Sequence, residues 1–190
     1  MKILEERIQK DAAVLPGDIL KADSFLNHQI DPELMMQMAE EFKRLFVNEH
    51  ITKILTVEAS GIAIACMCGY VFHVPVLFAK KAKTSNLSED VYCAPIHSYT
   101  HQTDGTVRIS KQYLNAHDRV LIIDDFLANG CACQALIALC RQASAQVAGI
   151  GICIEKSWQE GGKQLRGAGY RVESLARIAS MENGTICFLK

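Results

Sequence analysis

The chain has 190 residues and lacks an apolar run long enough to cross a membrane. Its longest apolar stretch, residues 62–72, covers about eleven residues, whereas a transmembrane helix needs roughly twenty. The first residues, Met1 to Arg7, are charged and amphipathic, unlike a secretory signal. An excess of one charge is also absent, because 20 Lys and Arg residues face 21 Asp and Glu residues. We therefore expect a cytoplasmic protein that binds neither membranes nor nucleic acid.

The eight cysteines lack the spacing of a metal site or a disulfide framework. C-x-x-C pairs are absent, since one residue separates Cys66 from Cys68 and Cys131 from Cys133, and no histidine lies nearby at zinc spacing. Most cysteines lie among Ala, Ile and Val, where a free thiol behaves as a small apolar group. We expect reduced, mostly buried thiols and no metal ligands. Cys131 differs from the others because it follows a glycine loop.

Apolar strands alternate with helices along most of the chain, which predicts a single α/β domain with a mainly parallel, twisted sheet flanked by helices. Helices are predicted over 2–12, from Asp31-Pro32 onward, over 61–71 and over 130–141, with a glycine-rich helical turn over 161–169. Strands are predicted over 19–21, 53–57, 75–79, 119–123, 147–155, 170–174 and 186–189. Loops are predicted over 24–29 and over the Lys-rich, mobile segment 80–89. Asp104-Gly105 predicts a hairpin turn between strands 91–100 and 106–110.

The most informative stretch is 120–130, in which four apolar residues lead to two adjacent acids, Asp124 and Asp125, and then to a glycine loop. Such a strand has three known uses. A nucleotide-triphosphatase also needs a GxxxxGK[ST] loop, which is absent, and a receiver domain needs more chain than follows Asp124. In a ribose-phosphate site, the carboxylates accept hydrogen bonds from sugar hydroxyls while the next helix N-terminus binds phosphate. This third use remains.

Two further segments fit a ligand with a second anionic group. Residues 56–61 also run from a strand through small residues into a helix, and Ser60 and Gly61 allow a close backbone approach to an anion. Strand-to-helix turns often contain Ser and Gly, so this signal is weak alone. Lys81 or Lys83 supplies a cation to a leaving pyrophosphate if the loop 80–89 closes over the site. The alternative interpretation of these lysines is a solvated basic loop.

Together these residues resemble the type I phosphoribosyltransferases and, more narrowly, the bacterial xanthine phosphoribosyltransferase family. The resemblance spans nearly the whole chain and is most specific in segments 24–31, 124–130, 154–157 and 169–178. It implies one domain over residues 1–190, with a core at about 31–155 and a small hood from about 14–30 and 156–190. It also implies a homodimeric purine-salvage enzyme that transfers phosphoribose from 5-phosphoribosyl 1-pyrophosphate to N9 of xanthine. Mg²⁺ would be carried by the pyrophosphate of the substrate.

The resemblance further implies a role for each site residue. Asp124 and Asp125 lie at the ribose hydroxyls, and Lys81 neutralises the leaving pyrophosphate. The remaining ligand contacts are Ala128, Asn129, Gly130, Cys131 and Ala132 at the 5-phosphate, Ala59, Ser60 and Gly61 at the pyrophosphate, and Leu20, Asn27 and Lys156 at the base. Many members of the broader family carry Thr or Ser in the phosphate loop, so here backbone N–H groups and the Asn129 side chain must satisfy the phosphate oxygens.

The three base-contacting residues fit an oxopurine. Lys156 only donates hydrogen bonds, which suits the 6-oxo and N7 edge, and Asn27 can bond a 2-oxo group. Leu20 provides an apolar wall. Read without the resemblance, Lys156 is simply a charged residue at a strand end. Two alternative functions stay open: a preference for hypoxanthine or guanine, with adenine disfavoured by its amino group, and a non-catalytic regulator that senses the activated ribose.

Overall fold

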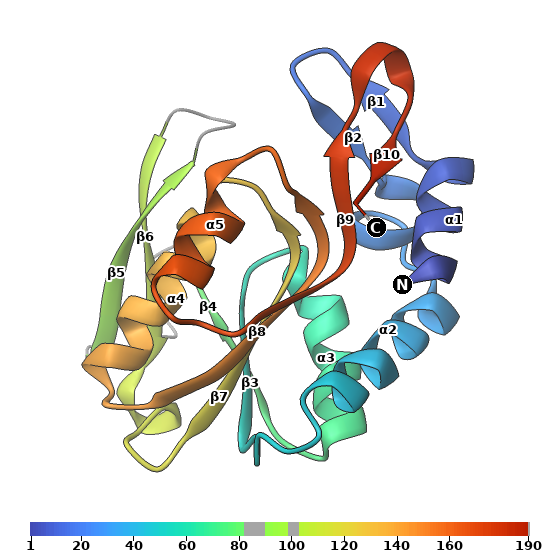
Figure 1. Cartoon of the computed structure of the whole chain (residues 1–190). Coiled ribbons are helices and arrows are strands. Elements are labelled where there is room, and N and C mark those ends of the chain that lie inside the picture. Colours follow the sequence, from blue (N-terminus) through green and yellow to red (C-terminus); the bar gives the residue numbers. More distant parts are fainter. Residues whose placement is uncertain (82–89, 99–102, 190) are drawn as a thin grey trace.

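A mainly parallel sheet forms the centre of the computed structural model, which describes residues 1–81, 90–98 and 103–189 (Figure 1). The strand order is β10-β9-β8-β7-β3-β4, and every neighbouring pair is parallel except β9 and β10. The strands are β3 (Lys53–Val57), β4 (Val76–Ala79), β7 (Arg119–Leu127), β8 (Gln146–Lys156), β9 (Val172–Ser180) and β10 (Cys187–Phe188). The predicted fold class is confirmed.

Helices cover both faces of this sheet (Figure 1). One face packs against α1 (Lys2–Asp11), α2 (Pro32–Leu45) and α3 (Gly61–Phe72), and the other against α4 (Cys131–Gln142), α5 (Glu160–Gly167) and the hairpin β5 (Val91–Ser98) and β6 (Thr103–Ser110). Consecutive residues of β7 point to opposite faces of the sheet. Leu121 and Ile123 pack in the core on the side of α1, α2 and α3, and Val120 and Ile122 pack in the core on the side of α4 and α5. Burial on both faces explains why the strand is continuously apolar.

The N-terminal segment adds a small antiparallel pair, β1 (Ala13–Leu15) and β2 (Ile19–Lys21), near β10 and the end of β9 (Figure 1). The next residues form a π-helical turn, η1 (Asp23–Asn27), so the loop prediction for 24–29 is wrong over most of its length. The reason is burial: Phe25 and Leu26 are both fully buried in the core beside α1 and α2. Their packing imposes a helical turn on a polar-looking sequence.

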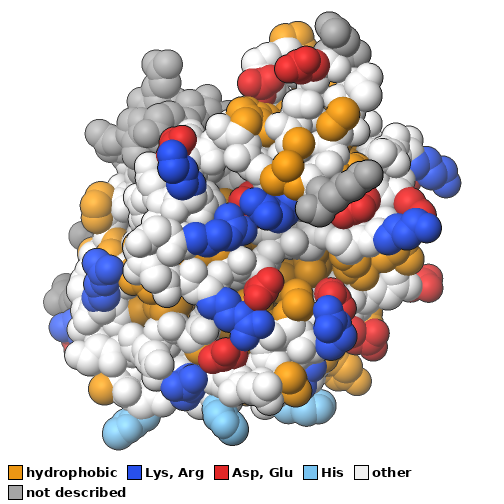
Figure 2. All heavy atoms as spheres, viewed as in Figure 1, with side chains coloured by type: hydrophobic (Ala, Val, Ile, Leu, Met, Phe, Trp, Pro, Cys, Tyr) orange, Lys and Arg blue, Asp and Glu red, His pale blue; other side chains and the backbone are white. Residues whose placement is uncertain are grey.

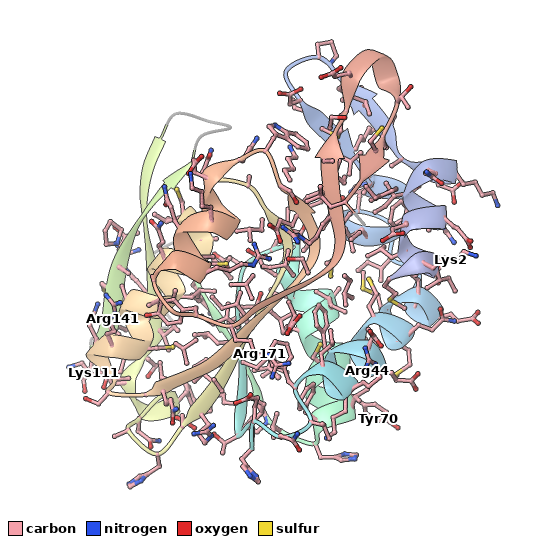
Figure 3. All side chains as sticks on the ribbon, viewed as in Figure 1. Lys2, Arg44, Tyr70, Lys111, Arg141 and Arg171 are labelled. Carbon is pink, nitrogen blue, oxygen red and sulfur yellow. The ribbon has the colours of Figure 1, made fainter. Side chains whose placement is uncertain are left out.

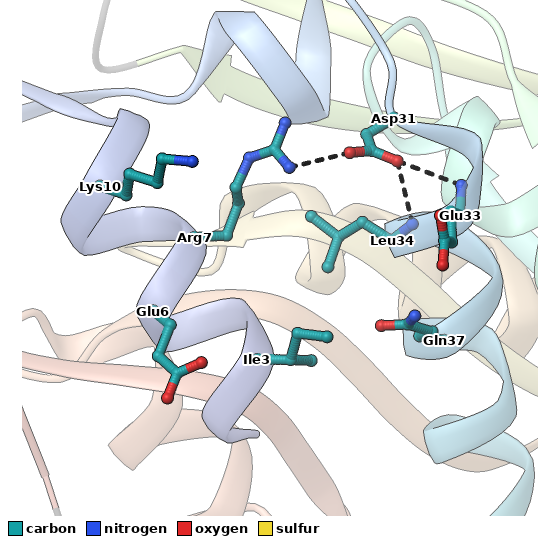
Figure 4. Close-up of a pocket in the computed structure, with 8 residues that line it drawn as sticks. All are labelled: Ile3, Glu6, Arg7, Lys10, Asp31, Glu33, Leu34 and Gln37. Carbon is teal, nitrogen blue, oxygen red and sulfur yellow. Dashed lines mark hydrogen bonds and ion pairs between the residues drawn. The ribbon is translucent and has the colours of Figure 1, made fainter.

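The start of α2 follows its sequence signals. Asp31 Oδ1 accepts hydrogen bonds from the Glu33 and Leu34 backbone N–H groups, both at 3.1 Å, and Asp31 Oδ2 lies 2.9 Å from Arg7 of α1 (Figure 4). The bond from Leu34 and the charge of Arg7 lower the pKa of Asp31 against the opposing effect of burial. A groove of about 270 Å³ lies between the two helices. Its lining contains none of the site residues predicted from the sequence.

Three strand predictions are wrong. The strand predicted over 170–174 starts at Val172 and continues to Ser180, because β9 pairs with β8 as far as Ile178 opposite Lys156. Asp104 and Gly105 do not form a turn but lie inside β6, where they pair with His97 and Ile96. The joining residues 99–102 lie outside the described ranges. Strand β7 does not end at Ile123 but continues to Leu127, because its pairing with β8 extends to Leu127 opposite Glu155. The two acids therefore lie within the strand rather than after it.

The cysteines are free thiols, as predicted, but their burial is mixed. Cys68, Cys133, Cys140 and Cys153 are buried, whereas Cys131 is partly exposed and three others are exposed. Burial raises the pKa of the Cys68, Cys133 and Cys153 thiols well above the ordinary value. The expectation of mostly buried thiols thus holds for half of them.

Arg171 ties the start of β9 to the end of α2 (labelled in Figure 3). Its guanidinium donates to Glu49 at 3.0 Å and to the Leu45 carbonyl oxygen at 2.7 Å, and it lies 4.9 Å from the centre of the Phe46 ring. Elsewhere on the face in Figure 2, basic and acidic side chains lie next to one another, in line with the net charge of −1. Among the described helices, none combines the length and hydropathy needed to span a bilayer.

Candidate active site

The carboxyl ends of four parallel strands meet at one edge of the sheet. Here β3, β4, β7 and β8 end, and the chain continues into residues 58–60, 80–81, 128–130 and 157–159. Ligands of open α/β sheets bind at this edge, because the loops and helix N-termini converge there. We call this edge of the sheet the carboxyl edge. Most of the site residues predicted from the sequence lie there.

Asp124 and Asp125 are adjacent buried acids of the carboxyl edge, with exposed fractions of 5% and 6%. The Asp125 backbone N–H donates to Asp124 Oδ1 at 3.0 Å. Burial, followed by the neighbouring Asp125 carboxylate, raises the pKa of Asp124 well above its ordinary value. Two adjacent carboxylates in this setting do not easily carry two charges, so hydroxyl donors or a cation would stabilise the ionised pair.

Two helix N-termini flank the acids and are open to anions. Within the described ranges, no side chain caps α3 or α4, and neither helix has an acid in its first turn. In contrast, α2 is capped by Asp31. Gly130, which precedes α4, has φ of +81°, a conformation that favours glycine. The first N–H groups of α3 and α4 lack intrahelical acceptors, so each helix offers donors and a positive dipole end.

Gly61 is where the first of these loops meets the acids. A Cβ atom at this position would lie 2.3 Å from Thr56 Oγ1 and 3.0 Å from Asp124 Oδ1. Glycine is therefore required by the close approach of β3 and β7 side chains, rather than by a special backbone angle. Gly61, the last of the three predicted pyrophosphate residues, thus lies directly beside the predicted ribose-binding acid.

Glu58 fastens the same loop to Lys81. Its backbone N–H donates to the Ala79 carbonyl oxygen at 3.1 Å, and its carboxylate accepts from the Lys81 backbone N–H at 2.5 Å. Lys81 acts on Asp124 electrostatically and opposes the rise in its pKa, which places this lysine near the acids as predicted. Sequence reasoning assigned no role to Glu58, although an acid within an anion-binding loop is a usable signal. Lys83 lies outside the described residues, as does the segment 82–89 of the predicted mobile loop.

The predicted phosphate loop, residues 128–130, is covered by the start of α5. Gly161 donates its backbone N–H to the Ala128 carbonyl oxygen at 3.1 Å. A Cβ atom on Gly161 would lie 2.4 Å from that oxygen and 2.6 Å from the Gly130 nitrogen. Sequence reasoning missed this contact. The sequence does contain one signal for this contact, which is the pair of glycines in the first turn of the helix. Each glycine lowers the stability of a helix by about 1 kcal/mol relative to alanine, so two in a row indicate close packing against another element.

The predicted base-contacting residues lie on three separate elements. Leu20 of β2 is buried, Asn27 ends η1 with an exposed side chain, and Lys156 ends β8. Lys156 Nζ donates to the Asp18 carbonyl oxygen at 2.6 Å, so the turn before Leu20 is held against the end of β8. Burial lowers the pKa of Lys156, and Asp18 opposes this effect. The place of Asn27 beside a base stays a prediction.

Comparison with known proteins decides the family. No protein-family model matches the chain. The xanthine phosphoribosyltransferase of Latilactobacillus sakei subsp. sakei is 56% identical over 189 residues, covering 100% of this chain and 97% of the relative. That of Pseudomonas entomophila is 53% identical over 190 residues and covers both chains fully. The chain belongs to the xanthine phosphoribosyltransferase family.

A solved structure has the same fold as this member of the xanthine phosphoribosyltransferase family. The adenine phosphoribosyltransferase of Rhodothermus marinus superimposes with a TM-score of 0.75 at 22% identity, covering 93% of this chain and 99% of that one. At this identity the likeness concerns the fold alone. It confirms the type I phosphoribosyltransferase fold predicted from the acidic strand and its loops.

Glu155, the residue before Lys156, is a buried acid with several hydrogen-bond donors. It is 2% exposed and accepts two hydrogen bonds from Arg166 at 2.8 and 2.7 Å and another from Ser174. Burial alone would raise the pKa of Glu155, but the bonds from Arg166 and Ser174 outweigh it and the pKa is lowered. Gly162 allows this, because its Cβ would lie 2.4 Å from Glu155 Oε1. The end of β8, including Lys156, is therefore rigidly held.

Cys131 is the thiol of the predicted phosphate loop. It lies at the end of a groove of about 660 Å³ between α4 and the β5–β6 hairpin. The groove is lined by Pro95, Ile96, Gly105, Thr106, Cys131, Gln134, Ala135 and Ala138. Burial raises the pKa of the Cys131 thiol, so the group is protonated at neutral pH and is a weak nucleophile.

Proposed function

We propose that the chain transfers the phosphoribosyl group of 5-phosphoribosyl 1-pyrophosphate to N9 of xanthine, producing xanthosine 5'-monophosphate and pyrophosphate for purine salvage. One observation carries the proposal: a buried Asp124–Asp125 pair lies beside two uncapped helix N-termini at the carboxyl edge. This arrangement suits a ribose that carries phosphate groups on both sides. Membership of the xanthine phosphoribosyltransferase family supports the choice of base.

The two loops would hold the two phosphate groups. The 5-phosphate would bind the N–H groups of residues 128–132, where α4 begins, and the Asn129 side chain. The pyrophosphate would bind residues 59–61 at the start of α3. Asp124 and Asp125 would accept hydrogen bonds from the ribose hydroxyls, which relieves the repulsion between the two carboxylates.

Catalysis would consist of positioning and electrostatic stabilisation. The bond between ribose C1 and the pyrophosphate oxygen breaks, the bond from C1 to N9 forms, and the N9 proton is released. Charge develops on the ribose and on the leaving pyrophosphate. The acids would stabilise the first, and Lys81, whose backbone is bonded to Glu58, would neutralise the second. Holding both reactants in place supplies much of the rate enhancement.

Mg²⁺ would arrive with the pyrophosphate of the substrate and would neutralise its charge. Such ions bind through one or two carboxylates together with substrate phosphates. The buried Asp124–Asp125 pair, in which one pKa is raised, fits this requirement because a nearby cation favours its ionised form.

The base would bind between Leu20, Asn27 and Lys156. Lys156 donates from a position held by the Glu155 network, so it favours an oxo group at the purine 6-position. A 6-amino group would face another donor, which disfavours adenine. Asn27 would bond the 2-oxo group that distinguishes xanthine from hypoxanthine.

The test is a base-competition assay with the purified chain, 5-phosphoribosyl 1-pyrophosphate and Mg²⁺. We expect pyrophosphate release with xanthine, slower release with hypoxanthine and guanine, and none with adenine, with the nucleotides identified chromatographically. A higher kcat/KM for hypoxanthine or guanine would contradict the assigned base. Binding of the activated ribose without turnover of any base would contradict the enzyme and favour a sensor.

Lys156→Gln is expected to raise KM for xanthine by about 10- to 100-fold and leave KM for the phosphoribosyl substrate unchanged, because it removes a charge-assisted hydrogen bond to the base. Steady-state kinetics with each substrate varied in turn give both constants. The matched control is Lys163→Gln, an exposed lysine of α5 that is 3.6 Å from Glu160. Equal effects of the two variants would remove Lys156 from the base site.

We also propose a homodimer in the cytoplasm, with a hood of residues 14–30 and 156–190 over a core of 31–155. The free thiols fit a reducing compartment. The placement of β1, β2 and β10 together at one end of the sheet fits the hood (Figure 1). Exposed Tyr70 and Val47 offer apolar surface for a second copy. Light scattering at assay concentrations measures the oligomeric state, and a monomer under turnover conditions would contradict the dimer.

A further inference from the structure

Thr56 of β3 has a hydroxyl group that is buried beside the carboxyl edge. The residue is 0% exposed, and within the described part of the chain its Oγ1 has no hydrogen-bond partner. A buried hydroxyl without a partner costs free energy, whereas valine has nearly the same shape without that cost. All other residues of β3 are also buried, and three of them are apolar. Stability therefore does not explain the hydroxyl, and a functional reason is needed.

The location of the hydroxyl supplies one. A Cβ on Gly61 would lie 2.3 Å from Thr56 Oγ1 and 3.0 Å from Asp124 Oδ1, so both oxygens lie close to the same small space at the carboxyl edge. Asp124 Oδ1 has one described donor, the Asp125 backbone N–H. A carboxylate oxygen can accept a second donor. The threonine hydroxyl is thus a free donor close to an acceptor with spare capacity.

We propose that Thr56 is a positioning residue whose hydroxyl donates to the Asp124 carboxylate when the phosphoribosyl substrate occupies the site. The proposal rests on the proposed function and adds a residue to it. A small rotation of Asp124 as it accepts the ribose hydroxyls would bring its carboxylate to Thr56. The bond would then fix the orientation of the carboxylate.

The test compares Thr56→Val with Thr56→Ser. We expect Thr56→Val to lower kcat/KM for the phosphoribosyl substrate at least tenfold, with KM for xanthine unchanged. We also expect its Tm to equal or exceed that of the wild type, because an unpaired buried hydroxyl is removed. Thr56→Ser, which keeps the hydroxyl, is expected to restore kcat/KM to within about threefold of the wild type. A purely structural residue would not combine unchanged stability with lost activity.

Thr52→Val is the matched control, at the residue that precedes the start of β3. The Thr52 hydroxyl has partners: it accepts from the Arg119 backbone N–H at 2.9 Å and lies 3.4 Å from Asp118 Oδ1. This variant is expected to lose Tm and keep its kinetic constants, the reverse of Thr56→Val. Full activity of Thr56→Val, or a clear drop in its Tm, overturns the role of Thr56. An inactive wild type in the same assay contradicts the proposed function as well.

Discussion

An Asp124→Asn enzyme is expected to melt at a higher temperature than the wild type at neutral pH and to have a kcat/KM at least about 100-fold lower. The stability gain follows from burial, which, together with Asp125, raises the pKa of Asp124 in the folded state. In the unfolded chain the pKa of this carboxyl is near its ordinary value of 3.8. Between these two pKa values the folded state holds more protons than the unfolded state, so stability falls as pH rises.

The pH dependence provides the measurement. The contribution of Asp124 to stability is fully present below pH 3.8 and is lost as pH rises through the raised pKa of the folded state. Asparagine does not ionise, so the Tm of the variant is expected to exceed that of the wild type by a margin that grows with pH and then levels off. Parallel Tm curves from pH 4 to 8 would show that Asp124 is not the cause.

The loss of activity has a separate physical reason. Asparagine keeps the size of the side chain but loses the negative charge that would face the developing sugar cation, and half of its polar end becomes a donor. Asp23→Asn is the control, because Asp23 is a partly exposed acid 3.1 Å from Lys21. If Asp124→Asn retains wild-type kcat/KM, the acids do not act on the ribose.

Gly161→Ala is expected to raise KM for the phosphoribosyl substrate at least tenfold and to lower stability by about 1–3 kcal/mol. The new methyl group would meet the Ala128 carbonyl oxygen at 2.4 Å and the Gly130 nitrogen at 2.6 Å. Both are backbone atoms and cannot rotate away, so either the phosphate loop or α5 must shift. Urea unfolding and steady-state kinetics measure the two effects.

Gly167→Ala, at the last residue of the same helix, is the matched control. A Cβ at Gly167 has nothing within 4 Å. Alanine there is expected to leave both KM values unchanged and to stabilise the protein by up to about 1 kcal/mol, because it favours the helix. If both glycine variants behave alike, the loss at Gly161 reflects helix propensity rather than contact with the phosphate loop.

Local sequence patterns predicted the features of this protein that depend on neighbouring residues. The apolar run before Asp124 predicted a buried strand, the alternation of elements predicted a parallel sheet, and Asp31-Pro32 predicted the start of α2. A parallel sheet in turn brings strand ends together, so the acids, both loops and Lys81 were correctly expected at one edge.

The features that could not be predicted from the sequence depend on contacts between residues far apart in the chain. The extension of β7 to Leu127 is imposed by β8, and the register of Pro95 opposite Thr106 overrides the local turn preference of Asp104-Gly105. Phe25 and Leu26 form a helical turn because the core lies beneath them. The roles of Gly161 and Thr56 depend on atoms more than thirty and sixty positions away in the chain, respectively, which no local window contains.

The bond from Lys156 to the Asp18 carbonyl oxygen gives the proposed base-binding lysine a second task. This backbone oxygen takes one of the three N–H donors of the ammonium group, and two donors remain for a purine oxygen. The proposed bond to the base would therefore add to the bond to Asp18, on a side chain whose position is already fixed. The turn that fixes it contains Gly17 and Asp18, which both have positive φ. A change in the shape of this hairpin tip would thus be felt at the base site through a single lysine.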